Sequence, residues 1–284
     1  MAADAKIEQV EAQAYRIPTE DPESDGSYRW TSTTLVTVHI QGGGARGFGY
    51  SYADAAAATL ITGKLAQIIS GRNPVDIPCC WRLMLDGVRN LGEPGIAMLA
   101  ISAVDAALWD LKGKLLELSV VDLLGVAREA VTAAGVSWFE EPVVHHDLEG
   151  LRILRDRTPA GMEIAAGEYG FTLPYFRRML QAGAVDVLQA DATRCGITGF
   201  LQAATLCESH HLQLSAHCAP SLHIHPCCAA PTLRHLEYFH DHARIESMLF
   251  DGFIQPVEGK LAPDRSRPGL GIELREGEAS HFRF

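Results

Sequence analysis

Short apolar segments alternate with segments of helical periodicity through the second half of the chain, from about residue 126. The apolar runs predict short strands near residues 136–140, 163–167, 185–190, 212–216 and 235–239. Between these runs, apolar residues recur at helical spacing over residues 148–157, 173–182, 198–209 and after Ser221. Strands and helices that alternate in this way are expected to form a parallel sheet with right-handed crossovers.

The first half has a different pattern, in which strands precede helices. Residues 6–17, 33–40 and 45–52 predict three strands, and helical spacing follows over residues 53–70, 76–90 and 94–116. The last of these helices is largely apolar, so it should be buried. Residues 18–29 are polar and acidic with two prolines, and they predict a loop that could cover an active site. The tail, residues 245–284, is punctuated by glycine and proline and predicts irregular strand and loop.

Gly42, Gly44 and Gly47 match the G-x-G-x-x-G pattern of nucleotide-binding loops. In such loops the glycines open a helix whose N-terminus holds a phosphate, whereas residues 48–52 predict a strand here. We therefore expect a glycine-rich hairpin turn at this position instead of a nucleotide site.

Composition narrows the class of protein. The 284 residues are 47% hydrophobic and 21% charged, which is typical of a globular protein. The net charge of −11 argues against nucleic-acid binding and provides no basic face for a membrane surface. Residues 1–9 carry no signal-peptide core, and the longest apolar stretch is broken by Ser102 and Asp105, so we expect a cytoplasmic protein. Seven cysteines without a CxxC pair predict buried thiols in a reducing compartment.

Five titratable residues stand at or just beyond the ends of the predicted strands of the second half. They are Glu140, Glu168, Asp191, His217 and Glu237, separated by 28, 23, 26 and 20 residues, each close to one strand–helix unit. Because the carboxyl ends of parallel strands form the active site of a (β/α) barrel, these side chains should meet there. A single acidic residue at a strand end is more often a helix cap or an ion-pair partner, and a single histidine is more often a packed core residue. The shared register of all five favours a site.

The residue types indicate a chemistry. Glu140 and Glu168 offer the hard oxygen ligands that Mg²⁺ prefers. A carboxylate such as Asp191 beside His217 would fix the imidazole tautomer and raise its basicity, which suits a general base. Glu237 could act as a hydrogen-bonding acid. Together they suggest abstraction of a proton next to a carboxylate, with the metal stabilising the enediolate charge.

Several motifs resemble the mandelate racemase branch of the enolase superfamily. They are WFEEP (138–142), Gly167-Glu168, QADATR (189–194), SAH (215–217), AVDAALWDLKG (103–113) and SRPGLG (266–271). The resemblance implies an α+β capping domain on a modified (β/α)₇β barrel, one Mg²⁺, and sugar-acid or related carboxylate substrates. It also implies that Glu140 and Glu168 are metal ligands. It makes Asp191 and His217 the base dyad and Glu237 the electrophilic acid. The segment that matches residues 18–29 helps to set substrate choice in that family.

The chain departs from the family pattern after Gly125. In the family, the capping domain is followed by a first barrel strand, a strand with Lys-x-Lys and a strand with the first metal carboxylate. The segment between Gly125 and residue 128 is too short to hold these three strands. Residues 128–135 resemble the helix just before the WFEEP strand. A full barrel takes about 250 residues. Residues 126–239 supply under half of that, so we expect an α/β fold with an incomplete (β/α) TIM-type barrel of about five strands and two open edges. The expected domains are a capping domain (1–122), the truncated barrel (123–244) and a C-terminal segment that returns to the capping domain (245–284).

These departures have chemical consequences. The absent third carboxylate predicts a weakened Mg²⁺ site, and the absent lysine argues against two-base racemisation. Lys112 and Lys114 spell Lys-x-Lys, but within a predicted helix, where their side chains diverge. Residues 194–198 hold one glycine where the family has two, which could shift Asp191 relative to His217.

Two functions therefore stay open from sequence. One is a Mg²⁺-dependent sugar-acid lyase or isomerase with impaired activity, in which His217 alone could still support dehydration. The other is a non-catalytic pseudoenzyme that binds a carboxylate ligand or a partner. A third hypothesis places a transition metal on His223 and His225 with Cys218, Cys227 or Cys228, although the spacing fits no zinc signature. The open strand edges also predict a homo-oligomer.

Overall fold

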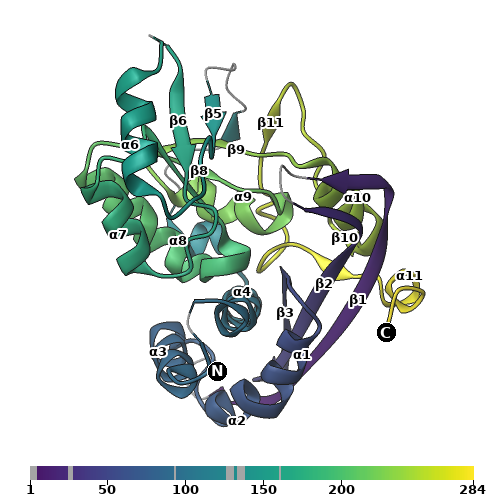
Figure 1. Cartoon of the computed structure of the whole chain (residues 1–284). Helices are drawn as coiled ribbons and strands as arrows, with labels where there is room; N and C mark the ends of the chain where they lie inside the picture. Colours follow the sequence, from purple (N-terminus) through teal and green to yellow (C-terminus); the bar gives the residue numbers. More distant parts are fainter. Residues whose placement is uncertain (1–4, 25–27, 93, 126–130, 133–137, 160) are drawn as a thin grey trace.

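The structure, a computed structural model, describes residues 5–24, 28–92, 94–125, 131–132, 138–159 and 161–284. An antiparallel sheet of three strands occupies the lower right of Figure 1, and a parallel sheet with its helices lies above it. The antiparallel sheet has the order β1 (Ile7–Ser24), β2 (Arg29–Gly42) and β3 (Ala45–Tyr52). A mixed α/β fold was predicted, and it is confirmed.

The glycine-rich segment forms the turn between β2 and β3. Gly43 and Gly44 adopt φ angles of 61° and 83°, which favour glycine in tight hairpins. A side chain at Gly47 would overlap the backbone of Ala107, so this glycine permits close packing between the strand and a helix. The predicted hairpin turn is confirmed.

A group of helices covers the antiparallel sheet. They are α1 (Ala56–Leu60), a π-helical turn η2 (Ile61–Leu65), α2 (Ala66–Ile69), α3 (Ile77–Val88) and α4 (Ile96–Leu116). Helix α4 is buried on nearly all sides and lies between the two sheets (Figure 1). Its Asp110 accepts hydrogen bonds from the backbone N–H groups of Phe48 (2.6 Å) and Leu270 (2.7 Å), which joins β3 to the C-terminal segment. The predicted burial of this helix is therefore confirmed.

The parallel sheet contains five strands in chain order, as predicted. They are β5 (Trp138–Glu140), β6 (Glu163–Ala166), β7 (Val187–Ala190), β8 (Gln213–Ala216) and β9 (Leu233–Leu236). The connecting helices are α6 (Leu148–Arg157), α7 (Leu173–Gln181), α8 (Ala192–Ser209) and α9 (Pro220–Ala229). Strand β9 ends earlier than the predicted strand 235–239, so Glu237 directly follows it. Among the described strands, β5 and β9 do not pair with each other, and the barrel is not closed.

Side chains bridge the two open edges. Trp138 of β5 packs edge-on against His235 of β9, with ring centroids 4.5 Å apart. The guanidinium of Arg234 lies over the Trp138 ring and also forms an ion pair with Glu163 of β6.

The segment before β5 differs from its predicted form. Residues 131–132 form β4 (Val131–Thr132), which pairs antiparallel with β11 (Lys260–Leu261). The prediction of a helix over residues 128–135 is therefore wrong at these two positions. The other residues of that segment lie outside the described residues. A strand two residues long can form here because β11 supplies its hydrogen-bonding partner from the C-terminal part of the chain.

Residues 18–29 are also different from the prediction, because most of them belong to the β1–β2 hairpin. Pairing is interrupted between Pro18 and Glu23 and resumes with Glu23 opposite Trp30. The indole N–H of Trp30 donates to Glu23 at 2.9 Å, which stabilises the resumed pairing. Strand β1 is an edge strand, where prolines are tolerated because one side of the strand needs no partner. The tip, residues 25–27, lies outside the described residues.

The tail holds more regular structure than predicted. It forms α10 (His240–Leu249), β10 (Phe250–Asp251), β12 (Glu273–Leu274) and α11 (Glu276–Ser280), and a short helix α5 (Val120–Leu124) was also not predicted. Helix α10 forms because Ile245 and Leu249 bury one of its faces. The tail returns to the first sheet, where the Arg16 N–H donates to the Phe282 carbonyl at 2.9 Å. The three-part domain division stays a prediction, and its boundary at 244/245 lies inside α10. Among the described residues, no helix is long and apolar enough to cross a membrane.

Candidate active site

The five predicted site residues stand at the same end of the parallel sheet. Asp191, His217 and Glu237 each directly follow a strand, because β7, β8 and β9 end one residue before them. The ladder continues through two of them: the His217 N–H donates to the Ala190 carbonyl (3.0 Å) and the Glu237 N–H donates to the Ala216 carbonyl (2.9 Å). This register turns the three side chains toward one another.

Asp191 and His217 are in direct contact. Nδ1 of His217 lies 2.9 Å from Oδ2 of Asp191, and Oδ1 of Asp191 accepts the Thr193 N–H at 2.7 Å as the N-cap of α8. Burial raises the pKa of Asp191, but the hydrogen bond and charge of His217 outweigh burial and lower it. Burial lowers the pKa of His217, whereas Asp191 and Glu168 raise it, and the raising effects prevail. Gly196, the one glycine within residues 194–198, interrupts the helical conformation of α8 with a φ of 72°. Asp191 and His217 are nevertheless in contact.

Glu168 contacts two cationic groups. Its Oε2 lies 3.1 Å from Nε2 of His217, and its Oε1 accepts from Nη1 of Arg194 at 3.2 Å. The Arg194 guanidinium also lies 3.8 Å from Oδ2 of Asp191 and stacks over the Tyr169 ring. Arg194 was not among the predicted site residues. The available signal was its position three residues after Asp191, which places both on one face of α8.

Glu140 and Glu141 add negative charge beside this cluster. Oε2 of Glu140 accepts the Trp138 indole N–H at 2.9 Å, and burial together with the charges of Glu237 and Glu168 raises its pKa. Burial and the charge of Glu168 raise the pKa of Glu141 to about 7. Oε1 of Glu141 is buried without a hydrogen-bond partner among the described residues. A bound cation would relieve this repulsion.

Glu237 also approaches Nε2 of His217. Its Oε2 is 3.9 Å from Nε2 of His217 and accepts the Cys218 N–H at 3.2 Å. The Cys218 thiol, 3.1 Å from the same Nε2, also lies 3.4 Å from Oε2 of Glu237. Cys218 therefore belongs to this site, although the sequence suggested it only as a partner of His223 and His225.

His223 and His225 accept hydrogen bonds from backbone N–H groups instead of binding a metal together. Nε2 of His223 accepts the Ala192 N–H at 2.7 Å, and Nδ1 of His225 accepts the Val121 N–H at 3.3 Å. Burial lowers the pKa of His225 to about 4. Among the described residues, the one group of three or more possible metal ligands is His217, Cys218 and Glu237. The third hypothesis, a transition-metal site on His223 and His225, therefore finds no such cluster among the described residues.

Lys112 and Lys114 lie on α4, away from the strand ends. The ammonium of Lys114 pairs with Asp110 at 3.0 Å and with Glu273, while that of Lys112 lies over the Trp109 ring. They therefore do not replace the family's Lys-x-Lys pair, as predicted.

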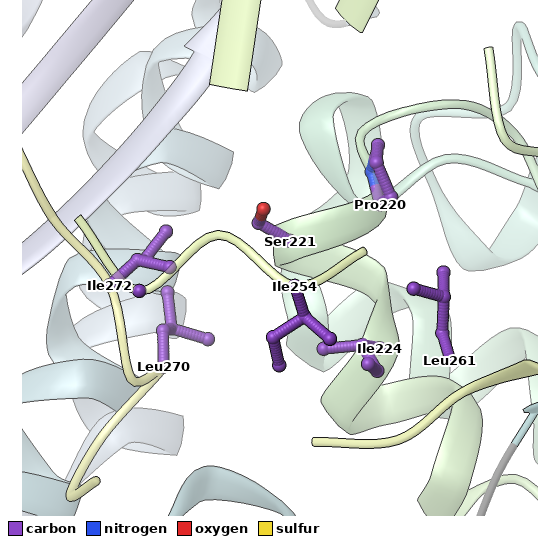
Figure 2. A pocket seen from close by; sticks show the side chains of 8 residues that line it. Pro220, Ser221, Ile224, Ile254, Leu261, Leu270 and Ile272 are labelled. Carbon is purple, nitrogen blue, oxygen red and sulfur yellow. The ribbon is translucent and has the colours of Figure 1, made fainter. Parts of the chain in front are cut away.

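A small cavity next to the site is unsuited to a substrate. Figure 2 shows it between α9 and the tail, with Ser221 at one side and the apolar side chains of Ile224, Ile254 and Leu270 around it. Its volume of about 10 Å³ has room for one water molecule, far below the ~300 Å³ or more of typical ligand pockets.

The donor set at the strand ends fits a hard divalent cation. Glu140 and Glu168 present carboxylate oxygens, and burial, together with the charges of Glu237 and Glu168, raises the pKa of Glu140. Arg194 and His217 both contact Glu168, so a bound ion would meet competition for its oxygens.

Comparisons with known proteins agree with this architecture. The family model for the mandelate racemase / muconate lactonizing enzyme N-terminal domain matches residues 19–125. A second family model, described as enolase C-terminal domain-like, matches residues 106–278. A mandelate racemase/muconate lactonizing enzyme-like protein from Rubrobacter xylanophilus superimposes with a TM-score of 0.95 at 38% identity, covering 98% of this chain and 100% of that chain.

Two further relatives have named activities or ligands. A 3,6-anhydro-α-L-galactonate cycloisomerase from Streptomyces coelicolor is 28% identical, covering 94% of this chain and 97% of the relative. The alignment with this cycloisomerase extends over 360 positions, although the chain has 284 residues. Some positions of the relative therefore have no counterpart in this chain, which is consistent with an internal deletion. The L-talarate/galactarate dehydratase from Salmonella typhimurium LT2, liganded with Mg and L-lyxarohydroxamate, has the same fold. Its TM-score is 0.87 at 23% identity, covering 99% of this chain and 93% of that chain.

Proposed function

The chain belongs to the mandelate racemase/muconate lactonizing enzyme branch of the enolase superfamily, and we propose that it is a Mg²⁺-dependent lyase or isomerase of sugar acids. The observation that carries this proposal is the 2.9 Å contact between Asp191 and His217, whose other ring nitrogen faces the carboxylates of Glu168 and Glu237. Relatives that act on sugar acids, including the cycloisomerase and the dehydratase, support the substrate class.

In this proposal His217 is the general base. Asp191 accepts the Nδ1–H, so the lone pair of Nε2 points toward the substrate and can take the proton α to its carboxylate. The electrons of the C–H bond form the enediolate. The electrons of the enediolate then form the C=C bond as the C–O bond breaks, and the β-hydroxyl takes the proton held by His217 and leaves as water, which gives a net dehydration. Glu237 lies close enough to Nε2 to donate a hydrogen bond to the reacting oxygens when it is protonated.

Glu140 and Glu168 would hold the Mg²⁺, which when bound supplies positive charge that stabilises the enediolate. This chain offers two carboxylates for the metal, where the family has three. Arg194 and His217 already contact the two oxygens of Glu168. We therefore infer that the Mg²⁺ site is weakened. No lysine faces His217 from the described strands, so the arrangement favours one-base elimination over two-base racemisation.

A non-catalytic role is the second candidate, and one observation favours it. The contacts of Arg194 and His217 balance the charge of Glu168 without any added ion. A chain held in that state would bind a carboxylate ligand or a partner and turn nothing over.

Melting curves with and without Mg²⁺ test the proposal, together with the Glu140→Gln and Glu168→Gln variants and a screen of sugar acids. We expect Mg²⁺ to raise the melting temperature of the unchanged protein and not of either variant, because ligand binding to the folded state stabilises it. Dehydration of a sugar acid that is lost in His217→Asn would support catalysis. A melting temperature indifferent to Mg²⁺, with no turnover, would favour the non-catalytic role. Turnover unaffected by His217→Asn would exclude the proposed mechanism.

A further inference from the structure

We propose that His217, Cys218 and Glu237 form a second metal site, which binds Zn²⁺ and excludes the general-base role of His217. These residues offer a nitrogen, a sulfur and an oxygen ligand, and their ligand atoms all lie within 4.8 Å of one another. This donor set is the one that Zn²⁺ prefers over Mg²⁺, because thiolate and imidazole are softer ligands than carboxylate and water.

The distances between the three ligand atoms lie within about 0.5 Å of those around a tetrahedral ion. Zinc bonds of about 2.0–2.3 Å at tetrahedral angles place two ligand atoms roughly 3.4–3.6 Å apart. Here Nε2 of His217 is 3.1 Å from the Cys218 sulfur and 3.9 Å from Oε2 of Glu237, and the sulfur is 3.4 Å from that oxygen. Shifts of a few tenths of an ångström would complete the triangle and leave a fourth position for water or another ligand.

The surroundings of the three ligands orient them for metal binding. Asp191 accepts the Nδ1–H of His217, as carboxylates do behind zinc-binding histidines, which fixes the tautomer whose Nε2 lone pair can bind a metal. Oε2 of Glu168, 3.1 Å from the same Nε2, would have to move aside or become the fourth ligand. The Cys218 N–H holds Oε2 of Glu237 in place. Cys218 and Ala219 adopt φ angles of 53° and 40°, an unfavourable conformation for residues with a side chain. This backbone brings the thiol beside His217 instead of away from it.

Charge favours the same ion. Burial and the charge of Glu237 raise the pKa of the Cys218 thiol, so a bound Zn²⁺ would have to displace the thiol proton to solvent. The thiolate and Glu237 would then together balance the charge of Zn²⁺. Bound Zn²⁺ would occupy the Nε2 lone pair that the base needs. The site would therefore inhibit turnover, but its formation does not depend on turnover or on Mg²⁺.

Zinc affinity measured on the whole purified chain, by competition with a chromophoric chelator, tests this proposal. We expect one Zn²⁺ per chain and a loss of affinity of at least tenfold in Cys218→Ser. Replacement of Zn²⁺ by Co²⁺ should give a sulfur-to-cobalt charge-transfer absorption that is absent in Cys218→Ser. Cys79→Ser is the matched control, because Cys79 is exposed on α3 and should not affect either result.

A second variant keeps the proposal testable if Cys218→Ser does not fold. Glu237→Gln should weaken Zn²⁺ binding while it keeps the charge-transfer absorption, since the sulfur ligand is still present. Equal Zn²⁺ affinity in Cys218→Ser and the unchanged chain would overturn the proposal, as would loss of binding in Cys79→Ser. The Mg²⁺-dependent melting shift should persist in Cys218→Ser and vanish in Glu168→Gln, so failure of this site and failure of the proposed function are separate results.

Discussion

Trp138, on the first strand of the parallel sheet, packs edge-on against His235 on the last strand, with ring centroids 4.5 Å apart. The five strands therefore form an arc whose two edges touch through side chains without backbone pairing. Trp138 also donates its indole N–H to Glu140, so the same residue connects the edge of the sheet to a proposed metal ligand.

Replacing Trp138 with alanine should lower the free energy of unfolding by about 2–4 kcal/mol, because a large half-buried ring and its contacts are lost. Trp138→Phe keeps a ring against His235 but loses the hydrogen bond to Glu140, so its loss should be smaller. Urea unfolding of the three proteins measures the difference. Equal stability of Trp138→Ala and the unchanged protein would mean that the edges are not held together by this contact.

Removing Arg194 should strengthen Mg²⁺ binding. In Arg194→Gln the Oε1 atom of Glu168 loses its cationic partner, so Mg²⁺ meets less competition and its affinity should rise several-fold. Without Mg²⁺, the variant should melt at a lower temperature, because Asp191 and Glu168 lose a balancing charge. Calorimetric titration and melting curves measure both effects.

Arg155→Gln is the control for that experiment, because Arg155 pairs with Asp186 at 2.7 Å away from the strand ends. It should not alter the Mg²⁺ response. Weaker Mg²⁺ binding in Arg194→Gln would show that the arginine supports the metal site instead of competing with it.

Asp191→Asn should reduce any sugar-acid turnover by roughly 10²–10⁴-fold, because an amide can orient the imidazole but cannot stabilise its protonated form. Asparagine can still cap α8, so the melting temperature should change little. Steady-state rates and a melting curve on the same preparation separate the two effects. A variant that keeps its rate would remove Asp191 from the proposed dyad.

The contribution of Glu246 to stability should fall as pH rises from about 4.5 to about 7. This carboxyl is fully buried, and burial raises its pKa to about 7, although the Tyr50 hydroxyl (2.7 Å) and the Ser221 N–H (2.9 Å) donate to it. The folded protein binds this proton more tightly than the unfolded chain. The penalty for ionisation therefore begins near pH 4.5 and is complete above pH 7, at up to about 3 kcal/mol.

Glu246→Gln should remove that part of the slope. Urea unfolding at pH 5 and pH 8 should show a smaller loss of stability for the variant than for the unchanged protein. Asp105, whose pKa burial also raises to about 7, is present in both proteins and contributes the same background. Parallel pH profiles would contradict the assignment to Glu246.

The open edge at β5 should mediate self-association. Phe139 is 47% exposed on this edge strand, although strands of closed barrels are covered by helices. Light scattering after size exclusion should show a homo-oligomer, and Phe139→Lys should shift the population toward the monomer. A monomer in both cases would mean that the exposed ring has no partner of its own kind.

The sequence predicted most of the parallel sheet because each strand there precedes a helix of clear periodicity. Asp191, His217 and Glu237 could be placed correctly from their positions alone, since a residue directly after a parallel strand must lie at the carboxyl edge of the sheet. The contacts of Arg194 with Glu168 and of Cys218 with His217 were harder to foresee. They depend on side-chain direction and on the unusual backbone angle of Cys218, which no periodicity encodes.

Predictions failed where long-range pairing determined the local structure. Residues 18–24 look like a loop because of Pro18 and Pro22, yet they extend β1, since β2 provides partners for Pro18, Glu23 and Ser24 at the two ends of this segment. Val131 and Thr132 form a strand only because Lys260 and Leu261 pair with them. Neither partner could be identified from the neighbouring sequence.

The far end of the β1–β2 hairpin is attached to α10 (Figure 1). Arg244 donates to the Pro18 carbonyl at 2.9 Å, and the Thr33 hydroxyl donates to Asp241 at 2.6 Å. Helix α10 begins three residues after Glu237. An exchange of this hairpin between relatives would therefore also displace the strand end that carries Glu237. Anyone who engineers selectivity into this scaffold should transplant hairpin and helix as one module.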